Sequence, residues 1–98
     1  MKRVLPKIEA RVRPHRDERG RETRLLAFAE LTIADAFVIK GIKILERDAE
    51  KFVVFPAEKG KGDKDRWYDV AHPCTLEARD AAVRAILDAY DAAKRSSQ

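Results

Sequence analysis

Residues 23–45, TRLLAFAELTIADAFVIKGIKIL, decide the fold class of this chain. Apolar side chains occupy every second position over residues 25–33, which is the pattern of a β-strand with one buried face. A short turn at residues 34–35 follows, and residues 37–45 form a second apolar run. The stretch therefore predicts two consecutive strands joined by a short turn.

Gly41 interrupts the second of these strands where the alternation changes. Phe37 and Ile39 share one face of the strand, whereas Ile42 and Ile44 have the opposite parity. A β-bulge adds one residue to a strand and so reverses the alternation beyond it, and a lone glycine inside a strand often marks one. We therefore predict a bulge at Gly41 that returns all four apolar side chains to one face.

Further segments complete the expected strands and loops. Residues 4–13 alternate as a half-buried edge strand, and residues 14–21 form a polar hairpin loop. Residues 51–56 form a fourth short strand that ends at a proline. Residues 57–66 are charged and contain two glycines, which predicts a flexible loop, and residues 66–71 (RWYDVA) return as a short strand.

From Thr75 the apolar pattern changes to the 3.6-residue period of an α-helix. Thr75 is a good N-cap residue, and Glu77 places an acid in the first turn, where the helix dipole favours negative charge. The apolar stripe of this helix comprises Leu76, Val83, Ile86, Leu87 and Tyr90. We predict an α+β fold, an antiparallel meander of four to five strands with one C-terminal amphipathic helix. It forms a single domain over residues 1–98 with a disordered tail at residues 95–98.

The composition is that of one globular domain with a densely charged surface. Of the 98 residues, 45% are hydrophobic and 39% are charged, and there is a single cysteine. No apolar run approaches the length that spans a bilayer, and the N-terminus lacks the apolar core of a secretory signal. These features predict a cytoplasmic protein without membrane association.

Positive charge is concentrated in the first quarter of the chain. The net charge is +4, and residues 1–25 hold nine Lys or Arg against four Asp or Glu. Arg11, Arg13 and Arg24 lie on or beside the first two predicted strands. A basic segment attracts polyanions, above all nucleic acid, although a strand pair that is only solvated carries such charge as well.

Residues 69–75, DVAHPCT, bring a carboxylate, an imidazole and a thiol close together in the sequence. A Cys–His nucleophile pair usually draws its members from different parts of a fold, and zinc needs three or four protein ligands. The only other histidine, His15, belongs to a distant loop. Because Pro73 favours extended backbone at His72, we interpret the segment as a strand-to-helix junction and expect no catalysis, metal site or cofactor.

The charged loop and the aromatic residues after it form a further candidate site. Gly60 and Gly62 lie among lysines but lack the spacing of a Walker phosphate loop. The cations of this loop are Lys59, Lys61, Lys64 and Arg66. Next to Trp67 and Tyr68, they suit phosphate contact combined with base stacking, whereas the alternative is a solvated loop whose own acids cancel its charge.

Three motifs, taken in order, resemble those of the bacterial SpoVG family, named for stage V sporulation protein G, a septation regulator. They are FVIKGIKI at residues 37–44, KFVVFPA at residues 51–57 and DVAHP at residues 69–73. The resemblance extends over about residues 4–92. It implies a small α+β homodimer that binds DNA and RNA as a regulator of septation, sporulation or gene expression, without enzymatic activity or a cofactor.

The resemblance also implies where nucleic acid is contacted. In the family, basic residues lie just after the proline of the second motif and just before the aspartate of the third. These positions are Glu58, Lys59 and Tyr68 here, so that only Lys59 keeps a positive charge. Further cations of the lengthened loop are Lys61, Lys64 and Arg66.

Two functions remain open from the sequence. One is a homodimeric nucleic-acid-binding regulator, whose exposed edge strands are covered by the second copy. The other is a non-enzymatic protein–protein interaction module of a division or transcription complex. For the first function, the residues expected to contact DNA or RNA are Arg11, Arg13, Arg24, Lys59, Lys61, Lys64, Arg66, Trp67 and Tyr68.

Overall fold

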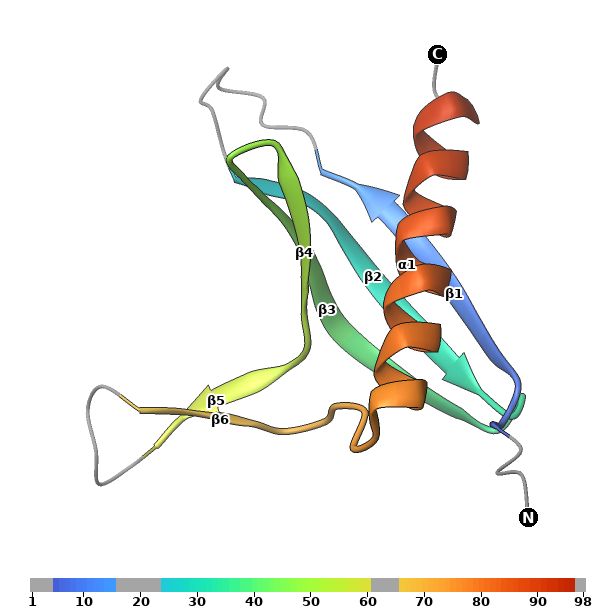
Figure 1. The fold of residues 1–98 in the computed structure, drawn as a ribbon, viewed down its shortest axis with the longest axis vertical. Helices are drawn as coiled ribbons and strands as arrows, with labels where there is room; N and C mark the ends of the chain where they lie inside the picture. The colour runs from blue at the N-terminus through green and yellow to red at the C-terminus, as the bar shows by residue number, and fades with distance from the viewer. Residues whose placement is uncertain (1–4, 16–23, 61–65, 97–98) are drawn as a thin grey trace.

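The computed structural model describes residues 5–15, 24–60 and 66–96 of the chain. Six strands and one helix follow one another along it (Figure 1). They are β1 (Ile8–Pro14), β2 (Leu25–Ile33), β3 (Phe37–Arg47), β4 (Glu50–Val54), β5 (Ala57–Lys59), β6 (Trp67–Asp69) and α1 (Leu76–Ser96). The fold is α+β, as the sequence predicted.

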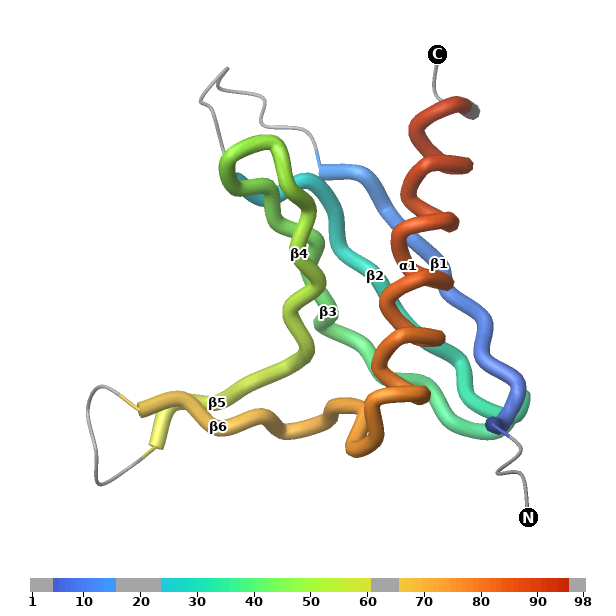
Figure 2. Tube along the Cα trace, viewed as in Figure 1, coloured from blue at the N-terminus to red at the C-terminus, as the bar shows by residue number. Residues whose placement is uncertain are grey.

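The strands form two separate sheets. A four-stranded antiparallel meander has the order β1-β2-β3-β4, and β5 pairs only with β6. This β5–β6 hairpin extends away from the main sheet and from α1 (Figures 1 and 2). The sequence predicts a flexible loop that includes Ala57–Lys59. That prediction was wrong, because these residues pair in register with Trp67–Asp69.

Two tight turns set the register of the meander. Ala34 and Asp35 connect β2 to β3, and Asp48 and Ala49 connect β3 to β4. All four residues have positive φ, between 53° and 67°. Positive φ at both central residues is the geometry of a type I′ turn, whose twist matches that of the flanking strands. The short turn predicted after β2 is therefore confirmed.

The predicted bulge at Gly41 is also present. Ala29 pairs with Ile42 and Leu31 pairs with Ile39, so that two residues of β3 lie opposite the single residue between Ala29 and Leu31. Gly41 has a φ of 84°, which a side chain rarely permits. The bulge buries Ile42 completely and leaves Ile39 half-buried on the same face.

Phe37 is on the same side of β3 as Ile39 but is not buried. Its side chain is 72% exposed, at the end of β3 beside the tight turn. The regular register from Phe37 to Ile39 keeps Phe37 on the predicted side of the strand, but its side chain is not buried there. At the bulge, Lys40 and Gly41 are both exposed, and buried and exposed residues alternate again from Ile42 to Ile44.

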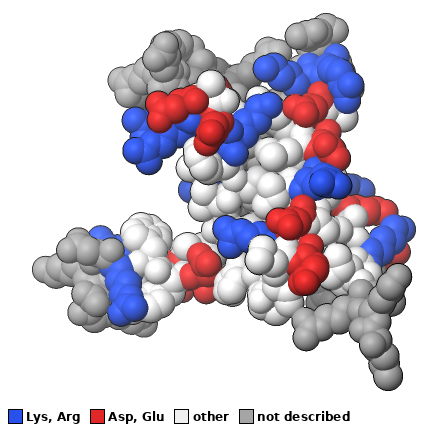
Figure 3. Space-filling view, viewed as in Figure 1, with Lys and Arg blue, Asp and Glu red and all other residues white. Residues whose placement is uncertain are grey.

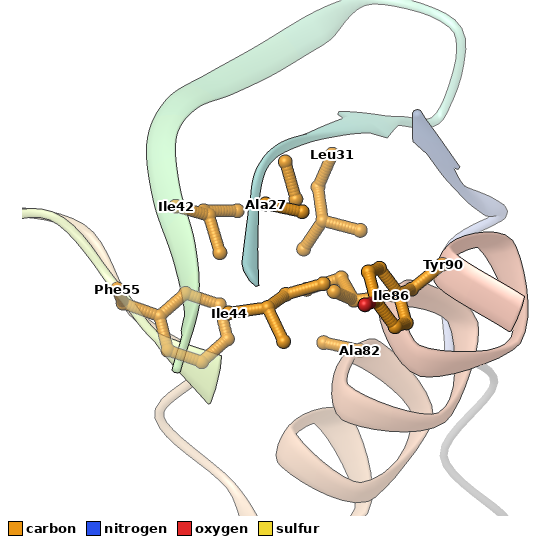
Figure 4. Packing of buried hydrophobic residues seen from close by; sticks show 9 residues of the cluster. Ala27, Leu31, Ile42, Ile44, Phe55, Ala82, Ile86 and Tyr90 are labelled. Carbon is orange, nitrogen blue, oxygen red and sulfur yellow. The ribbon is translucent and has the colours of Figure 1, made fainter. Parts of the chain in front are cut away.

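The hydrophobic core lies between the main sheet and α1, which packs chiefly against β1 and also against β2. Figure 4 shows side chains from β2 and β3 directed toward those of α1, with Phe55 closing one side. The buried residues of this core are Ala27, Ala29, Leu31, Ile42, Ile44, Phe55, Ala82, Ile86 and Tyr90. We call the opposite face of the main sheet the outer face.

Thr75 caps α1 by accepting a hydrogen bond from the amide of Ala78, as the sequence predicted. Leu76 is 71% exposed, so that its predicted place in the buried stripe was wrong. The helix instead buries Ala82 and Ile86, four residues apart, and Leu76 falls to the side of that line. The helix runs to Ser96, beyond the point where the tail was expected to begin. Within the described residues, no helix is long and apolar enough to cross a membrane.

Candidate nucleic-acid interface

The predicted contact residues fall into three places. Arg11 and Arg13 lie exposed on β1, on the outer face, because their neighbours Ala10 and Val12 pack against the core. Arg24 is exposed just before β2. The β5–β6 hairpin contains four further predicted contact residues, which are Lys59, Arg66, Trp67 and Tyr68. Lys61 and Lys64 lie outside the described residues.

One cross-strand row on the outer face joins a cation to an aromatic ring and then to a second cation. Arg13 pairs with Phe28, Phe28 with Lys43, and Lys43 with Val54. Phe28 is 41% exposed although it lies on a central strand. The His15 ring stands at 88° to the Phe28 ring with 5.8 Å between centroids. Phe28 is therefore an exposed aromatic platform flanked on both sides by positive charge.

A hollow lies beside this row, over the β3 bulge. Arg11 pairs with Glu30, and Lys40 and Gly41 are the two bulge residues opposite that pair. The hollow has a volume of about 370 Å³. Its lining includes Arg11, Arg13, Phe28, Glu30, Lys40 and Gly41. Three cations therefore surround it against one carboxylate.

The β5–β6 hairpin presents a different aromatic residue on each of its faces. On one face the guanidinium of Arg66 lies 5.6 Å from the centroid of the Tyr68 ring, within the range of a cation–π contact. Tyr68 also lies against Gly60, where an added Cβ would come within 2.5 Å of the ring. On the other face Trp67 pairs with Lys59 and is 64% exposed.

A second hollow connects this Trp67 face to the main sheet. It has a volume of about 460 Å³ and lies between the hairpin, the middle of β3 and the end of β4. Its lining includes Gly41, Lys43, Val54, Pro56, Trp67 and Asp69. Because Gly41 lines both hollows, the arginines of β1 and the Trp67 face of the hairpin belong to one continuous surface.

Among the residues that the structure describes, the ion pairs do not involve the cations of this surface. In the described part of the chain, Lys7 forms ion pairs with Glu9 and Asp35, and Lys51 forms one with Asp91. None of Arg11, Arg13, Arg24, Lys59 and Arg66 lies within 4 Å of a described carboxylate. Over α1, by contrast, acidic and basic side chains are interspersed (Figure 3).

Lys7 neutralises Glu9, the acid of β1 that precedes the two arginines. The Lys7 ammonium lies 3.1 Å from the Glu9 carboxylate and 3.4 Å from that of Asp35. The hydrogen bond to Glu9, together with its charge, raises the pKa of Lys7 above its ordinary value. Glu9 therefore subtracts little from the positive potential of Arg11 and Arg13.

The junction before α1 has the geometry of a connector. His72 Nδ1 lies 2.9 Å from the carbonyl oxygen of Pro73, and the Cys74 thiol is exposed. Among residues 5–15, 24–60 and 66–96, no group of three or more His, Cys, Asp or Glu is placed to hold a metal ion. Val70 donates its amide to Pro56 at 2.8 Å and so closes the base of the hairpin.

Sequence reasoning missed Phe28, Lys40 and Lys43 as members of this surface. The alternation of β2 placed Phe28 opposite the core, but the alternation does not say which residues lie beside it on neighbouring strands. That information depends on the register, which the two type I′ turns and the bulge determine. The signal available in the sequence was a large aromatic residue on the polar face of a strand.

Comparison with known proteins places the chain in a family. The family model SpoVG matches residues 6–92. A protein of Lachnospira eligens is 32% identical over 75 residues, 76% of this chain and 83% of that protein. A protein of Archaeoglobus fulgidus is 38% identical over 64 residues, 65% of this chain and 73% of that protein.

A protein of Symbiobacterium thermophilum is 36% identical over 75 residues, and this chain spans about half of it, 52%. All three relatives have the same name, septation protein SpoVG, and in each the assignment to septation is marked as provisional. The family model extends over nearly all of the described fold, from the start of β1 to the last turns of α1. The chain therefore belongs to the SpoVG family.

Proposed function

We propose that this protein is a non-enzymatic, nucleic-acid-binding regulator that acts as a homodimer in the control of septation or gene expression. The observation that carries the proposal is the projecting β5–β6 hairpin, which exposes two cations beside two aromatic rings. Membership of a family whose members are named for septation supports the cellular context.

The hairpin has the two kinds of group that an unspecific nucleic-acid site combines. Lys59 and Arg66 are exposed cations that can contact phosphates, and this contact releases counterions. Trp67 offers an exposed ring on which a base can stack. The Arg66 guanidinium lies over the Tyr68 ring. Its positive charge is therefore close to position 68, where the family resemblance predicts a basic residue. Arg66 thus restores the charge that Tyr68 itself lacks.

Two features support the homodimer. A two-stranded hairpin alone is marginally stable in water, and the described hairpin is hydrogen bonded mainly within itself. Val70 and Leu76, beside the hairpin, are large apolar side chains that remain exposed. A second copy that covers them would stabilise the hairpin and remove these groups from water. Analytical ultracentrifugation tests this part, since we expect twice the chain mass of 11.2 kDa, and a monomer would overturn it.

Fluorescence anisotropy with labelled DNA and RNA pools tests the binding function. We expect the double variant Lys59→Ala/Arg66→Ala to bind several-fold more weakly than the wild type at low salt, because two phosphate contacts are lost. The matched control is Arg79→Ala/Arg84→Ala, which removes the same charge from exposed positions of α1. Equal losses in both double variants, or no binding by the wild type, would overturn the proposal.

A further inference from the structure

We infer that the outer face of the main sheet binds an unpaired nucleic-acid strand, with Phe28 as the base platform and Arg13 and Lys43 as phosphate contacts. The inference rests on the proposed function and extends it to a surface and a substrate form. It assigns residues on β2 and β3 that the hairpin site does not contain.

The first argument is the spacing in the row Arg13–Phe28–Lys43. Neighbouring strands lie about 4.8 Å apart. The backbones that carry Arg13 and Lys43 are therefore about 10 Å from each other, with Phe28 between them. A base that stacks on Phe28 therefore has a cation on each side for the phosphates that flank it. The register partners are fixed by backbone pairing and do not depend on side-chain rotamers.

The second argument is that the ring is held in place and yet accessible. His15 packs perpendicular to Phe28 with its backbone amide bonded to the Leu26 carbonyl at 2.9 Å. The neighbours of Phe28 along β2, Ala27 and Ala29, point into the core, on the opposite face of the sheet from the Phe28 ring. A fixed aromatic ring loses little conformational entropy when a base stacks on it.

The third argument is the path that leads away from the ring. The bulge places Gly41 where the two hollows meet, and a glycine in a strand marks a point where a ligand can approach the backbone closely. A Cβ at Gly41 would have only the Pro56 side chain nearby, at 3.9 Å. A strand that leaves Phe28 can therefore cross Gly41 and reach Trp67, the second aromatic residue of the surface.

The charge of the surface favours a polyanion over a second copy of this chain. Both hollows together are lined by four cations and two carboxylates. The four cations are Arg11, Arg13, Lys40 and Lys43. A twofold contact would bring the same patch of two copies together, and like charges placed opposite each other weaken an interface.

The aromatic residues favour an unpaired strand over a duplex. A base can stack on a protein ring only when its own face is free, and in a duplex that face is covered by the neighbouring base pairs. Phe28 and Trp67 are both exposed on this surface. A duplex could engage the cations alone and would gain nothing from the two rings.

The test measures the affinity of the full chain for a labelled single-stranded oligonucleotide and for the matching duplex, by anisotropy at low salt. We expect Phe28→Leu to weaken single-strand binding on the order of tenfold and to leave duplex binding unchanged. The control Phe52→Leu makes the same change on the outer face, at a position whose register partner is Leu45 and not a cation. It should leave both affinities unchanged.

A second variant separates this site from the hairpin. Arg13→Ala/Lys43→Ala should weaken single-strand binding several-fold, while Arg79→Ala/Arg84→Ala on α1 should have a smaller effect. Trp67 is the single tryptophan of the chain, so that its fluorescence reports whether the strand still reaches the hairpin. Circular dichroism and sedimentation confirm that each variant keeps the fold and the oligomeric state of the wild type.

The outcomes are distinguishable. Wild-type binding with unchanged affinities in Phe28→Leu and Arg13→Ala/Lys43→Ala would overturn this inference and leave the proposed function standing. Variants that change the oligomeric state would show that the outer face is an interface between copies, which also overturns it. No binding of any nucleic acid by the wild type would overturn both.

Discussion

The side-chain oxygen of Thr75 accepts a hydrogen bond from the backbone amide of Ala78 at 3.1 Å. This contact satisfies one of the amides that the first turn of a helix leaves without a partner. It fixes the start of α1 shortly after His72 and Pro73, which follow the hairpin in the chain. The segment that held the best catalytic candidates of the sequence therefore also contains the N-cap of α1.

Removal of the cap should cost measurable stability. We expect Thr75→Ala to lower the free energy of unfolding by about 1 kcal/mol, because the Ala78 amide loses its partner. Thr75→Ser and Thr75→Asp keep an acceptor oxygen and should stay close to the wild type. Urea unfolding of the three variants measures the difference, and equal loss in all of them would show that the hydrogen bond is not the cause.

Two large aliphatic residues of α1, Ile86 and Leu76, should differ sharply in their effect on stability. Ile86 is fully buried between the helix and the sheet, whereas Leu76 is exposed. We expect Ile86→Ala to cost about 2–5 kcal/mol because it leaves a cavity. Leu76→Ala should cost less than about 0.5 kcal/mol within a monomer. Thermal and urea unfolding test this, and a large loss for Leu76→Ala would indicate that this residue is covered in solution.

Gly41 should be replaceable only at a cost in backbone strain. Its φ of 84° lies in the left-handed region, while the space around its Cα is open except for Pro56. We expect Gly41→Ala to destabilise the fold by about 1 kcal/mol. Gly41→Asn should cost less, because asparagine tolerates positive φ better than other residues. If alanine were neutral at this position, the bulge would not have the conformation described.

Cys74 and His72 should be dispensable for binding. The Cys74 thiol is exposed, and the described contact of the His72 ring is with the neighbouring Pro73 carbonyl. We expect Cys74→Ser and His72→Ala to change the free energy of unfolding by less than about 0.5 kcal/mol and to leave nucleic-acid affinity unchanged. Loss of a function in a variant that remains folded would contradict the interpretation of this segment as a connector.

The sequence predicted most of the main sheet because its signals are local. Alternation identified β2, the change of parity at Gly41 identified the bulge, and the 3.6-residue period identified α1. It missed β5 because Ala57–Lys59 has no apolar alternation of its own and is a strand only through pairing with β6. Leu76 was misplaced because one period fits several nearby stripes, and contact with β1 selects among them.

The proposed binding surface was predictable only in part. Charge and position identified Arg11, Arg13 and the hairpin cations, and the structure places them on the exposed face of β1 and on the hairpin. Lys43 could not be identified, because its position beside Phe28 depends on the register across the bulge. A pattern in one sequence describes each strand separately. This surface depends on the register between the strands, which such a pattern does not contain.

Salt dependence of single-strand binding tests the central claim most directly. If Arg13, Lys43, Lys59 and Arg66 each contact a phosphate, the plot of log affinity against log salt should have a slope of about −3. In Arg13→Ala/Lys43→Ala the slope should fall to about half that value, with two contacts remaining. A slope near zero, or no binding at low salt, would contradict the account, since neither is compatible with phosphate contacts.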